Sequence, residues 1–456
     1  MSEPRESHQE AGEERDPLAE AEDLSPKRWG QEARRVLERR SQHGTWTGAE
    51  VFLHANARWA LELDARSGGS ASSHGQGLSA IARVWRDSRV GVASAPVSAA
   101  EHLEALLDEA AHRASTGAPA SFPSAPARAS HALPEWRPQL SAPRARALAE
   151  RIVREVVPAG VVVQALVVTQ RSSASVLVRS DGFEAGWTQE GEDAFLRCET
   201  TRGAVVDAVA SPRASADEQV DLAALRARLA EAVEALEGPA EAPDLSLPLV
   251  LRPSVAAPLV AGLAGLLRGD VVVSIPALLR AQGRKLFPSL LSVEDDPLHP
   301  LGTRRRQMDD EGCDAQALRL VDEGRLMGFL HSEETAALLG AAPSGRGFRD
   351  GASLASPLPL NLCVMPRRDA LPAHYTELVA RVETFTTMAR PGTISLIAGG
   401  WEVRDGRRVR RVTPLELDLP LLETFRSLRG VGSDLTFFPS ADGCGTPTLV
   451  LPPPRG

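Results

Sequence analysis

Histidine, acidic and cysteine side chains are the groups of this chain that could bind a metal ion or transfer a proton. The chain has ten histidines. None of them is followed by a glutamate and then by a second histidine four or five positions on, the spacing of helical zinc-protease motifs. The nearest pattern, His331-Ser332-Glu333-Glu334, lacks the second histidine. An apolar segment follows it, so the pattern is typical of a helix N-terminus with acidic residues in its first turn.

Two acidic clusters are further candidates for ion binding. Glu294-Asp295-Asp296, followed by His299, and Asp309-Asp310-Glu311 carry the carboxylates that hard cations prefer. Adjacent side chains of an extended chain point to opposite faces, so such a run does not converge on one ion. Whether either cluster binds an ion stays open at this point.

The cysteines are scattered and form no CxxC pair, which argues against a disulfide framework or a zinc ribbon. We therefore expect reduced thiols in a cytoplasmic protein. The four are Cys198, Cys313, Cys363 and Cys444.

Composition narrows the class of protein. The 456 residues are 43% hydrophobic and 24% charged, which is typical of a soluble globular chain. The net charge of −9 argues against a nucleic-acid-binding surface. The first residues show no signal-peptide pattern. The longest apolar run, near Pro258–Leu267, is far shorter than the ~20 residues that span a bilayer. We expect partners that are neither nucleic acid nor membrane.

The distribution of apolar residues predicts an α+β fold. In the N-terminal part we expect strands at 51–61 and 78–92, a Gly/Ser-rich loop at 67–77 and a hairpin turn at 86–89. Ser98 and Glu101 have the spacing of a capping box before a helix. The predicted regions are a disordered acidic tail (1–26), an N-terminal α/β region (27–114), a Pro/Ala/Ser-rich linker (115–143), a middle strand/helix region (144–237) and a β-rich C-terminal domain (248–456).

The middle and C-terminal regions have their own predicted elements. Pro143 opens a helix, and a second helix over 222–236 stops at Gly238. Between them we expect short strands at 161–168, 174–179, 185–189 and 194–199. The C-terminal region begins with a strand at 248–251 and a helix at 254–267, for which Ser254 is the expected N-cap.

An ordered set of short motifs between Pro248 and Leu451 resembles the TldD/PmbA family of zinc-peptidase-related proteins. No single motif is specific, but their order and spacing are, while residues 50–240 match more loosely. The motifs are Val293–Pro297, Met308–Gly312, Leu320–Leu326, Thr335–Gly340, Ser344–Gly347, Pro357–Asn361, Gly432–Leu435 and Pro447–Leu449.

The resemblance places this chain with the non-catalytic PmbA/TldE kind of subunit. In the catalytic TldD kind, a helix carries HExxxH, whose glutamate acts as general base, and a cysteine near the C-terminus resembles a third ligand. Counting back from Gly269-Asp270, the three motif positions fall on Val260, Ala261 and Gly265, which carry no donor atom. Cys444 would then be a vestigial ligand.

The resemblance therefore implies a subunit with no catalytic residue and no metal site of its own. It would pair with an HExxxH-bearing TldD-like subunit, which holds the zinc, in a heteromeric metallopeptidase that acts on unfolded peptides. Two alternatives stay open. One is a stand-alone binding or scaffold protein, a homodimer without peptidase activity. The other is a hydrolase with an unrecognised metal site, for which the acidic clusters are the best candidates.

Overall fold

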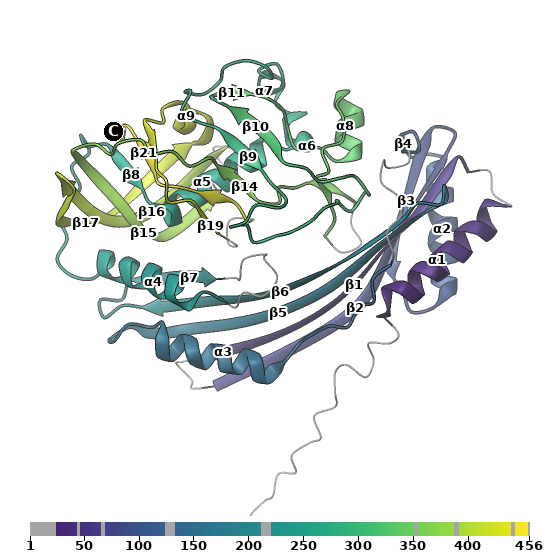
Figure 1. The fold of residues 1–456 in the computed structure, drawn as a ribbon, viewed down its shortest axis with the longest axis horizontal. Helices are drawn as coiled ribbons and strands as arrows, with labels where there is room; N and C mark the ends of the chain where they lie inside the picture. Colours follow the sequence, from purple (N-terminus) through teal and green to yellow (C-terminus); the bar gives the residue numbers. More distant parts are fainter. Residues whose placement is uncertain are drawn as a thin grey trace, which may run out of the picture.

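The computed structural model describes residues 24–454 except 43–45, 65–68, 124–132, 211–219, 351–353, 387–391 and 439–442. It has the predicted α+β fold, in which a long curved sheet lies beneath a β-rich C-terminal region (Figure 1). The predicted tail lies outside the described residues as far as residue 23. Pro26, the last residue of that prediction, already begins helix α1 (Pro26–Ser41), which was not predicted.

The N-terminal half is built on one seven-stranded antiparallel sheet in the order β4-β3-β2-β1-β5-β6-β7. Strands from both the 27–114 and the 144–237 regions belong to it. The strands are β1 (Gly48–Asp64), β2 (Gly69–Arg86), β3 (Arg89–Pro96), β4 (Ala118–Pro119), β5 (Val162–Arg179), β6 (Glu184–Glu199) and β7 (Val205–Ala210).

The strands are longer than the sequence predicts. Residues 69–77, predicted as loop, belong to β2 and pair with β1 as far as Asp64. The four short strands predicted between 161 and 199 are two long ones, β5 and β6, paired almost throughout. Backbone hydrogen bonds to a long neighbouring strand offset the weak strand preference of glycine and serine. The predicted hairpin turn is confirmed, with positive φ at Asp87 and Ser88.

Helices cover the convex face of this sheet (Figure 1). Helices α1 and α2 (Ala100–Ala114) pack on one end and α3 (Ala142–Glu155) on the other. Helix α4 (Leu222–Leu236) instead lies at the β7 edge and also contacts the C-terminal region. The helices predicted at the positions of α2, α3 and α4 are confirmed. The capping box is wrong, because the N-cap of α2 is Ala99 and no side chain caps it.

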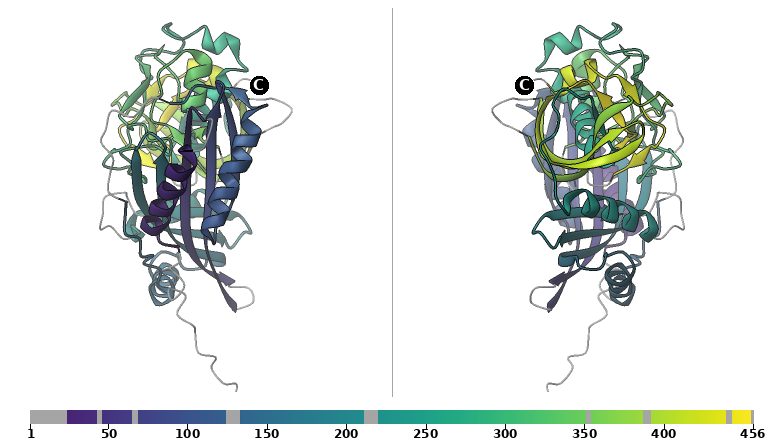
Figure 2. Two further views of the ribbon diagram at one scale, coloured as in Figure 1. Left: turned by 90° about the vertical axis from the view of Figure 1, so that its right-hand side faces the viewer. Right: turned by 90° about the vertical axis from the view of Figure 1, so that its left-hand side faces the viewer.

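The C-terminal region consists of two six-stranded sheets with helix α5 (Pro253–Leu266) between them. Figure 2 shows long strands of the first sheet curling around α5. The first sheet has the order β17-β16-β15-β8-β21-β18 and the second β11-β10-β9-β14-β20-β19. The strands are β8 (Leu249–Leu251), β9 (Val293–Asp295), β10 (Leu318–Asp322), β11 (Arg325–Leu326), β14 (Leu362–Val364), β15 (His374–Thr386), β16 (Thr393–Arg404), β17 (Arg407–Pro420), β18 (Gly430–Val431), β19 (Thr436–Phe437), β20 (Gly445–Thr446) and β21 (Leu449–Leu451).

Short elements complete this region. They are α6 (Gly269–Val272), α7 (Pro276–Leu279), α8 (Glu333–Leu339), α9 (Leu421–Arg426), β12 (Gly347–Phe348) and β13 (Ser356–Pro357). The predicted helix at 254–267 is confirmed as α5. Its expected N-cap is wrong, since Arg252 holds that position and the Ser254 hydroxyl donates to the Val379 carbonyl at 2.9 Å. No helix in the described ranges is long and apolar enough to cross a membrane.

Candidate functional site

Helix α5 carries the three positions that the family resemblance singles out. Val260 is fully buried in the core between the two C-terminal sheets, and Ala261 and Gly265 are half-buried. Cys444, just before β20, belongs to the same buried cluster as Val260. Val260 and Cys444 therefore belong to one large core, against which Ala261 packs, and Gly265 is not part of that cluster. In the described part of the chain, no group of three or more His, Cys, Asp and Glu side chains is placed to hold a metal ion.

The first acidic cluster divides between the interior and the surface. Asp295 is fully buried, and its Oδ2 accepts from Nε of the equally buried Arg346 at 2.5 Å. Its neighbours have other partners: Glu294 pairs with Arg319 at 2.7 Å, and Asp296 accepts from the Leu298 amide at 2.9 Å. The cluster thus alternates in direction, as expected for an extended chain.

Arg346 is a residue whose role the sequence did not reveal. In the sequence, Ser344–Gly347 stands out only as one of the short motifs of the family resemblance. In the structure its guanidinium also donates to four carbonyl oxygens, and Asp295 accepts from two further amides. Those partners are Ser344, Gly345, Asp295 and Gln316 for the guanidinium, and Leu360 and Asn361 for the carboxylate.

The carboxylates of the second acidic cluster likewise have donors of the protein itself as partners. Asp309 accepts from the amides of Glu311 (3.0 Å), Cys313 (2.9 Å) and Gly347 (2.9 Å). Asp310 pairs with Arg306 at 2.7 Å. Each of these carboxylates therefore fixes a loop of the C-terminal region, and none is held open toward an ion.

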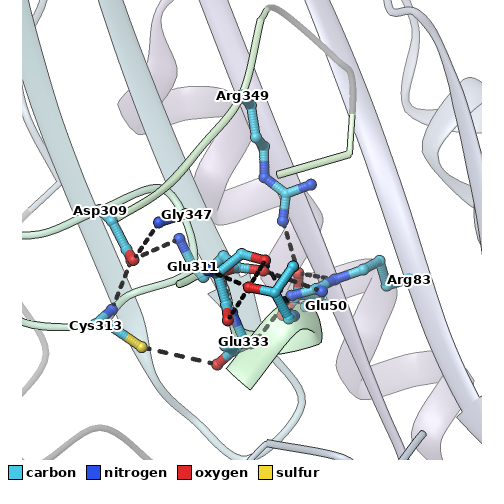
Figure 3. A network of polar contacts seen from close by, with 10 residues as sticks. Glu50, Arg83, Asp309, Glu311, Cys313, Glu333, Gly347 and Arg349 are labelled. Carbon is cyan, nitrogen blue, oxygen red and sulfur yellow. Dashed lines mark hydrogen bonds and ion pairs between the residues drawn. The ribbon is translucent and has the colours of Figure 1, made fainter. Parts of the chain in front are cut away.

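A buried polar network joins this cluster to the N-terminal sheet (Figure 3). Arg83 of β2 donates through Nε to Glu50 of β1 at 2.6 Å, and its Nη2 lies 3.2 Å from Glu333 Oε2 at the start of α8. Its Nη1 lies 3.5 Å from Glu311 Oε1. Nη2 of Arg349 lies 3.4 Å from Oε1 of Glu50. The network connects β1 and β2 with three separate segments of the C-terminal region, namely the two loops that carry Glu311 and Arg349 and the start of α8.

The charges of this network shift the pKa values of its carboxyl groups. Burial raises the pKa of Glu333 to about 7, and the negative charge of Glu311 adds to this effect while Arg83 opposes it. Burial also raises the pKa of Asp309 well above its usual range. Burial alone would raise the pKa of Glu50 too, but Arg83 and Arg349 outweigh it and hold the value low. Burial thus favours the protonated form of Glu333 and Asp309, whereas the two arginines favour the ionised form of Glu50.

Sequence reasoning missed this network because its members are far apart in the chain. It did predict a helix N-terminus at Glu333, which is confirmed: Ser332 and Thr335 form a capping box at α8. The partners of Glu333 follow only from the docking of the two halves. Burial and mutual contact of the charged groups indicate a connection between the halves, not an open reaction centre.

Comparisons with known proteins agree with this fold. Residues 245–452 match the PmbA/TldA metallopeptidase C-terminal domain. A metalloprotease of Synechocystis is 23% identical over 238 residues, which cover 44% of this chain and about half (47%) of that relative's length.

Solved structures extend the likeness to almost the whole chain. TldE from Thermococcus kodakarensis superposes with a TM-score of 0.76 at 16% identity, covering 93% of this chain and 98% of that one. A protein of Thermotoga maritima, described as a candidate modulator of a DNA gyrase, has the same TM-score at 18% identity, covering 93% and 99%. By sequence, the C-terminal domain of this chain thus belongs to the PmbA/TldD family, and the fold that the chain shares with these solved structures extends over almost its whole length.

Proposed function

We propose that this chain is the non-catalytic subunit of a heteromeric zinc metallopeptidase that acts on unfolded peptides in the cytoplasm. Its partner is an HExxxH-bearing TldD-like subunit, which supplies the zinc ion and the general base. This chain supplies no catalytic residue and no metal ligand.

The observation that carries the proposal is the chemistry of α5. The motif positions hold Val260, Ala261 and Gly265, none of which has an atom that can bind zinc or accept a proton. Val260 is 0% exposed within a close-packed core. A histidine there would need additional space, and its ring nitrogens would be removed from water. Helix α5 acts here as a packing element of the C-terminal region.

The contacts of the acidic clusters weigh against the hydrolase alternative. The buried carboxylates of Asp295 and Asp309 each accept hydrogen bonds from several protein groups. An ion would have to displace those donors, and an unpaired buried Arg346 would cost several kcal/mol.

Metal content and reconstituted activity test the proposal. Protein without a histidine tag, purified from zinc-supplemented medium, is expected to contain well under one zinc per chain and to cleave no unfolded peptide. Addition of the HExxxH-bearing partner should give cleavage, which disappears when the partner's motif glutamate is changed to glutamine. The partner alone is the matched control.

Two results would contradict the proposal, each in favour of one alternative. One tightly bound zinc per chain, or chelator-sensitive cleavage by this chain alone, would indicate a hydrolase. A homodimer that neither co-elutes with the partner nor changes its activity would indicate a scaffold protein.

A further inference from the structure

The concave face of the seven-stranded sheet is turned toward the C-terminal region (Figure 1). Its side chains are apolar at one end and polar further along the strands. At one end Phe52, Ile81 and Leu177 pack with Met308 of the C-terminal region. Successive side chains on one face lie two residues apart. Along β1 this face continues from Phe52 through His54 and Asn56 to Arg58, and along β5 from Leu177 through Ser175 and Ser173 to Arg171. Both strands thus change from apolar to polar side chains over six residues, roughly 20 Å.

Two arginines lie directly opposite each other on this face. Arg58 of β1 and Arg171 of β5 are antiparallel partners, and like charges in such a pair repel. Burial lowers the pKa of Arg171, and the positive charges of Arg58 and of Arg304, from the C-terminal region, lower it further. Asp193 pairs with Arg171, but among the described residues no carboxylate pairs with Arg58. The positive charges of three arginines thus act at this place, and Asp193 pairs with one of them.

The residues next to this arginine pair on the two outer strands are glycines, so no side chain fills the space beside the pair. Gly75 of β2 lies opposite Arg58, and Gly191 of β6 lies opposite Arg171. An added Cβ atom at either glycine would meet no other atom within 4 Å. A hollow of about 160 Å³ continues along the same face, lined by Arg58, Ala60 and Glu62 together with Ser73. The space beside the two glycines and this hollow therefore leave Arg58 accessible to a ligand.

We propose that the row Gly75, Arg58, Arg171 and Gly191 is a subsite for a carboxylate of an extended peptide. The inference rests on the proposed function, from which it takes peptides as the ligand class. A carboxylate between the two guanidinium groups accepts charge-assisted hydrogen bonds from the fork of Arg58. It also removes the repulsion between Arg58 and Arg171. The bare backbone at Gly75 and Gly191 leaves room for the chain that carries it.

Binding of three unstructured ten-residue peptides to the full-length chain tests the subsite. Each carries an uncharged fluorophore at its N-terminus, and binding is followed by fluorescence anisotropy. The first has a free C-terminus, the second is amidated and contains one glutamate, and the third is amidated with glutamine instead. The first or second peptide, or both, should bind about tenfold more tightly than the third, as expected for charge-assisted hydrogen bonds. The first two peptides distinguish a terminal from a side-chain carboxylate.

Substitution of Arg58 separates the subsite from general charge attraction. Arg58→Gln should abolish the preference for carboxylate peptides and leave the third peptide unaffected. Its melting temperature should stay equal or rise, because a repulsive pair is removed. Arg154→Gln is the control, since Arg154 is 66% exposed on α3, on the opposite face of the sheet. It should change neither binding nor melting temperature.

The possible failures are distinct. Equal affinity for the three peptides, or an equal loss in Arg58→Gln and Arg154→Gln, would overturn the subsite. Absence of binding to every peptide would overturn it as well. In each case the cleavage assay with the HExxxH-bearing partner and the third peptide still decides the proposed function by itself.

Discussion

Arg83 and Glu333, which are 250 residues apart in the chain, meet with Nη2 and Oε2 3.2 Å apart at the boundary between the N-terminal sheet and the C-terminal region. Their side chains are 9% and 15% exposed, so water screens this contact only weakly. The docking of the two halves is therefore sensitive to the ionisation of these groups.

The first prediction concerns pH. The pKa of Glu333 rises from 4.5 to about 7 on folding, mainly through burial. Protonation of this group therefore stabilises the fold fully below pH 4.5, and this stabilisation is lost as the pH rises through 7. Because Glu333→Gln stays uncharged, the wild type should lose on the order of 3 kcal/mol relative to the variant between pH 4.5 and 8. Urea unfolding at a series of pH values measures the difference.

A neighbouring residue provides the control for this titration. Glu334→Gln, at an exposed position in the same helical turn, should leave the pH dependence of the wild type unchanged. If the free energy of unfolding of the wild type and of Glu333→Gln changed with pH in parallel, burial would not raise the pKa of Glu333.

The second prediction concerns the pair Arg346–Asp295, whose side chains are both 0% exposed. Arg346→Met leaves a buried carboxylate without its partner and should lower the free energy of unfolding by about 3–5 kcal/mol. The double variant Arg346→Met/Asp295→Asn should recover part of that loss. Arg319→Met, which breaks a pair whose arginine is 39% exposed, should cost less than ~1 kcal/mol. Equal losses in Arg346→Met and Arg319→Met would refute the structural role of the buried pair.

The third prediction concerns α5. Leu263 is fully buried between the two C-terminal sheets, so Leu263→Ala should cost about 2–5 kcal/mol. Leu263→Asp should prevent stable folding, because it buries an unpaired charge. Leu338→Ala on α8, at a position 66% exposed, should stay within ~0.5 kcal/mol of the wild type. A melting temperature near that of the wild type for Leu263→Asp would mean that α5 is exposed.

The fourth prediction concerns thiol chemistry. Burial raises the pKa of Cys198 to about 11 and that of Cys363 to about 12, so the reactive thiolate is scarce at pH 8. A thiol reagent should therefore label the native protein slowly, and all four cysteines only after denaturation. Ser73→Cys, on an exposed part of β2, should be labelled rapidly in the folded protein. Fast labelling of native Cys363 would contradict its burial.

The sequence carried enough information for most helices but not for the extent of the strands. The buried residues Leu103 and Leu107 of α2 recur at helical spacing, and one buried helix face can be recognised from such local periodicity alone. By contrast, residues 69–77 form a strand through pairing with β1, and no property of these glycines and serines reveals that partner. Backbone pairing between distant segments overrides local preference.

At the candidate site, too, the features set by neighbouring residues could be predicted from the sequence, and the contacts between distant segments could not. The helix cap at Ser332 and Thr335 is a local pattern, and the structure has it. The partners of Glu333, namely Arg83 and Glu311, come from other segments and depend on how the halves dock. The facing pair Arg58 and Arg171 depends on strand register, which single-sequence patterns do not fix.

The apolar end of the concave face has a consequence for synthesis of the chain on the ribosome. Phe52, Ile81 and Leu177 can assemble as soon as β5 has emerged, whereas Met308, which covers them, is translated much later. At ~5–20 residues per second this surface stays uncovered for roughly ten seconds. An uncovered apolar surface of this kind is where a nascent-chain chaperone would bind, so the N-terminal half should need such protection until the C-terminal region has been made.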